Sequence, residues 1–209
     1  MNVKEGTEAS PRRRQAERTE ATRAALVTAA RRLFGERGYA EVGTEEVVRA
    51  AGVTRGALYH HFGGKRDLLE AVYLQVEEEI TQRIAEVALS GGAGGSPLEG
   101  MRSGAAMFVE ACTEPEVQRI VLLDAPAVLG WDRWREIAAS FGLGLIEASL
   151  TAAIEAGEIR KQPVRPLAHV LLGALDEAAM YVARAPDPGA RAEVTEVLDS
   201  LLDSLRATH

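Results

Sequence analysis

The side chains of this chain that could do chemistry gather between Arg55 and Lys65. Arg55, Gly56, Tyr59 and His60 fall on or near the outer face of a short predicted helix. A guanidinium donates hydrogen bonds to a base edge or a phosphate, and a phenolic hydroxyl donates to phosphate oxygens. Gly56 costs about 1 kcal/mol against alanine inside a helix, and close backbone approach to a phosphate or base would offset that cost. The group therefore indicates nucleic-acid binding, unless Gly56 is only tolerated near a helix start and Tyr59 is half-buried.

Two short helices joined by a tight turn must position this group. We expect Thr44 to cap the first helix and Gly52 to end it, because glycine readily adopts the left-handed backbone that follows many helices. We expect Thr54 to cap the second helix, and Leu58 and Phe62, four residues apart, to anchor it to a core. This spacing is typical of a helix-turn-helix, whose second helix enters the major groove of DNA.

A further helix is predicted to begin at Lys65, directly after Gly63-Gly64. Its free N–H groups together with Lys65 would bind one backbone phosphate, and the alternative is a solvated charge run. His60 and His61 do not suit a metal, because neighbouring helical residues point about 100° apart and a helical chelate needs a spacing such as i, i+4. The single cysteine, Cys112, completes no zinc set. The sequence thus predicts no metal site and no cofactor.

Two segments, AALVTAARRLFGERGY and TEEVVRAAGVTRGALYHHFGGKRDLLEAV, closely resemble the DNA-binding domain of the TetR family of bacterial transcriptional regulators. Their order and spacing match the family without a gap. The resemblance implies phosphate contacts from Thr44, Tyr59 and Lys65, and base contacts from Arg55, Gly56 and His60. Thr54 also falls on a position that the family often uses for DNA contact. Repression is the family's usual mode, so the resemblance implies a repressor on a palindromic operator.

Composition limits the alternatives. A chain of 209 residues with one cysteine can bury one or two modest cores and forms no disulfide within itself, which favours a reducing cytoplasm. We expect no signal peptide at the N-terminus, and no apolar run of the roughly 18 to 20 residues that a membrane span needs. The net charge of -7 is unevenly divided: residues 1–70 hold 13 Lys and Arg against 10 Asp and Glu, and residues 71–209 hold 11 against 21. The N-terminal part is thus less repulsive to DNA.

The periodicity predicts an all-α chain of two domains. Residues 1–18 read as a disordered basic tail, whose arginines at 12–14 either contact DNA or only add solubility. Residues 19–64 read as the helix-turn-helix domain, and residues 65–209 as a helical effector-binding and dimerisation domain that starts with a connecting helix, 65–89. The clearest interruption of the helical pattern is Ser90–Pro97, which reads as a flexible loop. Further helices are expected at the following ranges: 19–37, 55–61, 97–112, 115–128, 131–156, 165–184 and 188–206.

The last two predicted helices indicate a homodimer. The segment from Leu167 to Val182 is apolar nearly all round, which an outer helix of a monomer could not sustain. A four-helix bundle with the same helices of a second subunit would cover it, and the alternative is burial within one chain. The interface residues expected from these two helices are Leu167, Leu171, Ala174, Ala178, Val194, Leu198, Leu201 and Leu205.

The family resemblance also implies a small-molecule effector bound in the second domain. Apolar walls with a few polar groups fit an apolar or amphipathic molecule. Asp124 and Asp176 stand in apolar stretches, so each needs a partner if buried, and Arg119, Arg135 and His169 are candidates. Each candidate residue is otherwise a core residue, or part of an ion pair that only fixes the fold. The candidate lining residues are Phe108, Cys112, Asp124, Trp131, Trp134, Phe141, Asp176 and Met180.

Two other classes of protein share some of these sequence features. An enzyme would need an acid–base set such as Asp124, Asp176, Glu177 and His169, but the sequence contains no nucleophile elbow, phosphate loop or zinc signature. A ligand-free protein that organises DNA explains the N-terminal domain equally well, and a fully packed second domain would favour it. The prediction is therefore a DNA-binding regulator and not an enzyme.

Overall fold

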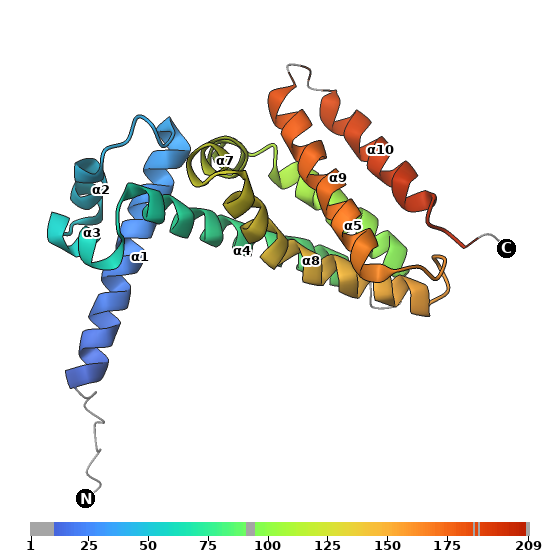
Figure 1. The fold of residues 1–209 in the computed structure, drawn as a ribbon, viewed down its shortest axis with the longest axis horizontal. Helices are drawn as coiled ribbons and strands as arrows, with labels where there is room; N and C mark the ends of the chain where they lie inside the picture. Colours follow the sequence, from blue (N-terminus) through green and yellow to red (C-terminus); the bar gives the residue numbers. More distant parts are fainter. Residues whose placement is uncertain (1–10, 91–94, 186, 188, 208–209) are drawn as a thin grey trace, which may run out of the picture. The chain divides into compact units, whose positions relative to one another are not determined.

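The computed structural model describes residues 11–90, 95–185, 187 and 189–207, which divide into two compact units between Val72 and Tyr73 (Figure 1). Apart from one isolated bridge between Ile159 and Arg206, the regular structure of these residues is helical. The all-α prediction is confirmed. Helix α4, Lys65–Ser90, contributes residues to both units.

The N-terminal unit packs α1 (Pro11–Arg37) against α2 (Thr44–Ala51) and α3 (Arg55–His61). Its core contains the expected stripe of α1, together with Leu58, Phe62 and the first turns of α4. Leu68, Leu69 and Val72 of α4 are fully buried, so this compact unit extends past the predicted boundary at residues 64 and 65. The predicted stripe of α1, all of it buried, is Leu26, Ala29, Ala30, Leu33 and Phe34.

Helix α1 begins at Pro11, earlier than the predicted start at Thr19. Residues 11–18 are therefore helical in this structure, and the expectation of a disordered tail was wrong for them. Proline is tolerated in a first helical turn, and the residues that follow it, RRRQAER, are good helix formers. The rest of the tail, residues 1–10, and the side chains at 12–14 lie outside the described residues.

The turn between α2 and α3 follows the predicted capping, with one exception. Gly52 has a φ of 68° and ends α2 in the left-handed region. Thr54 caps α3, and its Oγ1 accepts a hydrogen bond from the Ala57 N–H at 3.2 Å. Thr44 was predicted to cap α2, but Gly43 occupies the cap position and no side chain caps this helix. Thr44 is instead the first helical residue.

The C-terminal unit contains the later part of α4 and the elements that follow it. Helix α5 contacts α8, α9 and α10, and α8 also packs along α9. Its fully buried large side chains include Tyr73, Leu98, Ile120, Trp134 and Leu150. The elements are α5 (Pro97–Ala111), α6 (Pro115–Val117), η1 (Gln118–Asp124), α7 (Ala125–Leu129), α8 (Trp131–Glu155), α9 (Val164–Arg184) and α10 (Ala190–Asp203).

The predicted helix over residues 115–128 contains a π-helical segment, η1. Pro126 has no N–H to donate to the carbonyl four residues before it, which disfavours a regular α-helix here. The Ala125 N–H donates to the Ile120 carbonyl, five residues back, as a π-turn requires. This leaves the Val121 carbonyl without its α-helical donor, and the Trp134 Nε1–H donates to it at 2.8 Å. A side chain of α8 thus completes the hydrogen bonding of η1.

Helix α8 is continuous from Trp131 to Glu155, so neither Gly142 nor Gly144 breaks it. A Cβ at Gly142 would lie 3.1 Å from Leu172 Cδ1, which shows that glycine here permits close packing of α9. Among the described helices, α8 alone has the length and composition of a membrane span, with a mean hydropathy of 1.7 over its most apolar window. The expectation that no apolar run reaches this length was therefore wrong. In this structure α8 packs between helices of its own chain.

Candidate functional sites

The outer face of α3 presents the predicted DNA-contacting side chains to solvent. Leu58 and Phe62 are buried beneath it, and Arg55, Gly56 and His60 are exposed. Tyr59 is 48% exposed, so its ring is not covered by a neighbouring helix of the described chain. This orientation is the one that a recognition helix needs, because its polar side must be free to enter a groove.

Arg55 makes only exposed contacts within the described chain. Its guanidinium lies 3.4 Å from the Glu45 carboxylate of α2, and both side chains are mostly exposed. Its Cζ also lies 5.7 Å from the centre of the Tyr59 ring. Exposed ion pairs contribute about 0–1 kcal/mol, so Arg55 can exchange Glu45 for a phosphate or base at little cost.

Gly56 is not required by packing within the protein. A Cβ at this position would meet only Thr54 Oγ1, at 3.9 Å, which is ordinary contact. Nothing in the described neighbourhood of Gly56 therefore explains why glycine is present.

The start of α4 is partly occupied by the chain's own groups. The Lys65 ammonium lies 4.0 Å from the centre of the Tyr39 ring, and the Gly63 N–H donates to Asp67 Oδ2 at 3.0 Å. One backbone donor of the predicted phosphate site is thus already paired with a carboxylate. Thr44 is half-buried at the start of α2.

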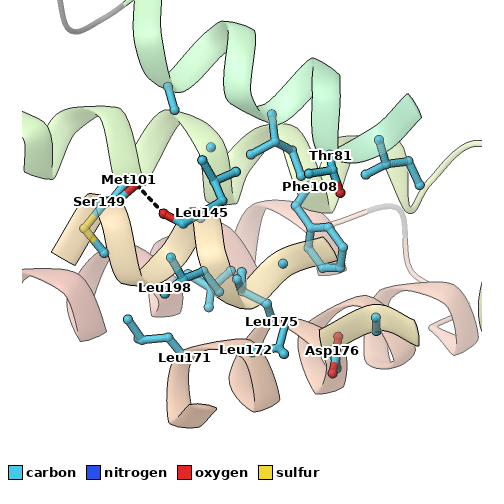
Figure 2. A pocket seen from close by; sticks show the side chains of 18 of the residues that line it. Thr81, Met101, Phe108, Leu145, Ser149, Leu171, Leu172, Leu175, Asp176 and Leu198 are labelled. Carbon is cyan, nitrogen blue, oxygen red and sulfur yellow. Dashed lines mark hydrogen bonds between the residues drawn. The ribbon is translucent and has the colours of Figure 1, made fainter. Parts of the chain in front are cut away.

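A cavity of about 120 Å³ lies within the C-terminal unit, between α4, α5, η1, α8, α9 and α10 (Figure 2). Its walls are mainly aliphatic, with the rings of Phe108 and Trp134. Figure 2 shows Met101 and Ser149 toward one end of the cavity and Asp176 toward the other. The polar residues in its lining are Glu77, Thr81, Ser149 and Asp176.

Two buried carboxyls give the cavity an acidic end. Asp176 pairs with Arg135 of α8, which confirms one of the three partners considered for it; Arg119 and His169 are exposed. Burial raises the pKa of Asp176 to about 6, against the opposing effect of Arg135. Burial, together with the nearby Asp176, raises the pKa of Glu77 to about 7, although a hydrogen bond with Tyr73 acts in the other direction.

Three of the predicted lining residues lie at the cavity: Phe108, Trp134 and Asp176. The other five are elsewhere. Cys112 is buried, and burial raises the pKa of its thiol; Met180 is also buried, away from the lining. Trp131 is 55% exposed and contacts Trp134, with ring centres 4.8 Å apart and ring planes tilted by 39°. Asp124 and Phe141 are half-buried outside the lining.

Sequence reasoning missed the contribution of α4. Glu77, Ile80, Thr81 and Ile84 line the cavity, whereas the sequence suggested only a connecting helix here. The available signal was the position of Glu77 and Thr81, four residues apart, beside the apolar stripe of α4. A carboxylate in that position is buried or exposed depending on a small rotation of the helix, which the sequence does not fix.

The outward face of α9 and α10 also differs from the prediction. Leu198 and Leu205 are buried within the chain, so they belong to its own core and not to an exposed surface. Leu167 and Leu171 pack on one core cluster, Ala178 and Val194 on another, and Ala174 is half-buried. Leu201 is exposed, as predicted, although it also borders the cavity. The large apolar side chains exposed on these two helices are Val170, Tyr181, Val197 and Leu201.

A helix-turn-helix unit joined through α4 to a helical unit with an internal cavity defines a class of DNA-binding regulators. Residues 26–72 match the model of the bacterial regulatory proteins of the tetR family, and residues 98–205 match the tetracyclin repressor-like C-terminal domain. The chain belongs to the TetR family of transcriptional regulators.

Individual relatives agree with this assignment. A TetR-family transcriptional regulator from Pectobacterium atrosepticum is 35% identical, with a TM-score of 0.81 over 92% of this chain and 97% of that one. The TetC protein of transposon Tn10 from Escherichia coli is 28% identical over 163 residues, 76% of this chain and 79% of TetC. The regulator CymR from Pseudomonas putida is 47% identical over 75 residues, 35% of this chain and 37% of CymR.

RolR, solved in complex with resorcinol, shares the fold, with a TM-score of 0.72 over 93% of this chain and 91% of that one. Its sequence identity of 19% carries no further inference about the ligand of this chain.

Proposed function

We propose that the protein is a dimeric repressor of the bacterial cytoplasm. It binds a palindromic operator through α3 and leaves it when a small molecule occupies the cavity of the C-terminal unit. The observation that carries the proposal is the exposed polar face of α3, anchored by Leu58 and Phe62 in a TetR-family chain. In this proposal the N-terminal unit, which ends at Val72, is the DNA-binding domain, and the unit that begins at Tyr73 is the effector-binding and dimerisation domain.

The proposed DNA contacts rest on the exposed face of α3 and on the positions that the TetR family uses. Arg55, Gly56 and His60 face the bases, and Tyr59, Thr44 and Lys65 hold phosphates, with Thr54 at the start of α3 between them. Two such faces on one dimer would read two half-sites of a palindrome. The effector must bind the DNA-incompetent state more tightly, since a ligand with equal affinity for both states shifts nothing.

Selection of bound sequences from random duplexes tests the proposal. We expect a palindrome, with genomic matches that identify the controlled genes. Recovery of no motif, with binding that disappears as salt rises, would favour a protein that organises DNA.

Ala105→Leu fills part of the cavity, because Ala105 lines it, and should keep operator binding while losing release by effector. Release that persists in this variant would place the effector elsewhere.

Arg55→Ala should cost about 1–3 kcal/mol of binding free energy on the preferred operator and relax selectivity at one base position. The fold should be unaffected, because the lost pair with Glu45 is exposed. Binding to operators with single base changes checks this. Arg32→Ala is a matched control, since Arg32 of α1 forms an exposed pair with Glu36. Equal loss on operator and random DNA would make Arg55 a phosphate contact.

Lys65→Ala should weaken binding on all DNA sequences alike and lower the slope of log K against log salt by about 1. Tyr59→Phe should also weaken binding on all sequences, but with an unchanged slope, because the lost donor carries no charge. Titrations at several salt concentrations separate the two. A change of selectivity in either variant would contradict the assignment to phosphates.

The dimer should form through the exposed face of α9 and α10, as a four-helix bundle. The double variant Val170→Glu and Val197→Glu should be a folded monomer at micromolar concentration, because both side chains lie outside the chain's own core. Sedimentation equilibrium checks this. Leu123→Glu, an exposed apolar site on η1, is the control and should remain dimeric. A monomeric unsubstituted protein would overturn the bundle.

A further inference from the structure

The lining of the cavity in the C-terminal unit disfavours anionic ligands. Among its described lining residues the charged side chains are Glu77 and Asp176, and no Lys, Arg or His lines it. A buried carboxylate or phosphate on a ligand would face two carboxyls without a counter-ion in the wall. Since a buried charge needs a partner of opposite sign, fatty acids and other organic anions are poor candidates.

The two carboxyls differ in what already neutralises them. Asp176 has the Arg135 guanidinium as a direct partner. Glu77 is 8% exposed, and its hydrogen bond is made with the neutral Tyr73 hydroxyl. The same hydroxyl donates to the Trp134 carbonyl at 3.2 Å, and a phenol has one proton to give. An ionised Glu77 therefore competes with the Trp134 carbonyl for the Tyr73 hydroxyl proton. A ligand with a positive charge and several N–H donors would donate to Glu77 and leave the Tyr73 hydroxyl to the Trp134 carbonyl.

The rest of the wall suits a ring or a short chain beside such a charge. Phe108 and Trp134 line the cavity, and aromatic faces attract cations at close range. The volume of about 120 Å³ is comparable to an engineered cavity of about 150 Å³ that holds benzene. It is well below the roughly 300–1,000 Å³ of sites for drug-sized molecules.

We propose that the effector is a small lipophilic amine, with one ring or an equivalent short chain, bound as its ammonium against Glu77. This inference rests on the proposed function, in which the cavity is the effector site. The ammonium donates to the Glu77 carboxylate, which frees Tyr73 to donate to the Trp134 carbonyl. The apolar part of the molecule fills the space between Phe108 and the aliphatic walls.

Three probes of the same shape and different charge test the class of ligand: benzylamine, benzyl alcohol and benzoate. Their binding to the full-length protein is measured by calorimetry, without DNA. Benzylamine should bind at least tenfold more tightly than benzyl alcohol, and benzoate most weakly. Glu77→Gln should lower the benzylamine affinity by roughly 10- to 100-fold, the range of a lost charge-assisted hydrogen bond. It should leave benzyl alcohol within about twofold.

Glu78→Gln is the matched control, because Glu78 is the exposed neighbour of Glu77 on α4. It should bind benzylamine as the unsubstituted protein does. Tighter binding of benzyl alcohol or benzoate, an equal effect of both substitutions, or no binding by any probe would overturn the amine inference. None of these results depends on operator binding. A palindrome recovered in the operator selection would therefore still support the proposed repressor.

Discussion

Trp134→Ala is expected to lower the free energy of unfolding by about 3–5 kcal/mol, the range for removing a large buried side chain. The Trp134 side chain is 1% exposed and borders the cavity, so its removal enlarges a space that the surrounding helices already leave open. It also leaves the Val121 carbonyl without the indole N–H that donates to it at 2.8 Å. Urea unfolding at fixed protein concentration measures the change, because a dimer unfolds at a concentration-dependent midpoint.

Trp131→Ala is the matched control for this experiment. Trp131 lies three residues earlier on α8 and is 55% exposed, so its loss should cost about 1 kcal/mol or less, mainly from the lost ring contact with Trp134. Trp134→Phe keeps a ring and removes the donor, and should cost about 1–3 kcal/mol for the unpaired carbonyl. Equal losses in the two alanine variants would contradict the buried position of Trp134 and its support of η1.

The two tryptophans also show where sequence reasoning reaches its limit. Both were candidate lining residues, and residues three apart on a helix lie on the same side. Of the two, only Trp134 lines the cavity. Segment η1 covers Trp134 and leaves Trp131 in solvent. This arrangement depends on the π-helical segment Gln118–Asp124, which Pro126 favours and which the helical spacing of the sequence does not reveal.

The helix-turn-helix could be predicted residue by residue because its signals are local. Gly52 needs a left-handed backbone, Thr54 supplies a cap, and Leu58 with Phe62 fixes which face of α3 is buried. The second unit offers fewer such signals. The stripe of α10 was read as one interface, yet Leu198 is 7% exposed and Leu201 is 44% exposed. Neighbouring positions of an apolar stripe divide between core and surface according to where α5 and α9 lie.

The burial of Glu77 also depends on how neighbouring helices pack, so the sequence did not predict it. Because burial raises the pKa of Glu77, the free energy of unfolding depends on pH. The pKa of Glu77 is raised from 4.5 to about 7, mainly by burial, with Asp176 adding to the effect and Tyr73 opposing it. Between these values the folded chain retains a proton that the unfolded chain has released. The contribution of Glu77 to stability is therefore complete below about pH 4.5 and is lost as the pH rises to about 7.

Glu77→Gln should remove this loss, because glutamine is neutral in both states. The difference in free energy of unfolding between the variant and the unsubstituted protein should shift in favour of the variant by about 3 kcal/mol between pH 4.5 and pH 7 and then level off. Taking the difference cancels groups that titrate alike in both proteins, while Asp176, with a pKa of about 6 and paired with Arg135, broadens the transition. Urea unfolding at half-unit pH intervals measures the curve.

Glu78→Gln, at the exposed neighbour of Glu77 on α4, is the matched control for the substitution itself. A flat curve for Glu77→Gln would mean that Glu77 is ionised in the folded protein throughout, with a positively charged partner that the Tyr73 hydroxyl does not supply. A saturating amount of benzylamine should flatten the curve of the unsubstituted protein. A bound ammonium stabilises the ionised carboxyl and so lowers the pKa that burial raises. The pH profile thereby reports on the same carboxyl as the binding series, through stability and not through affinity.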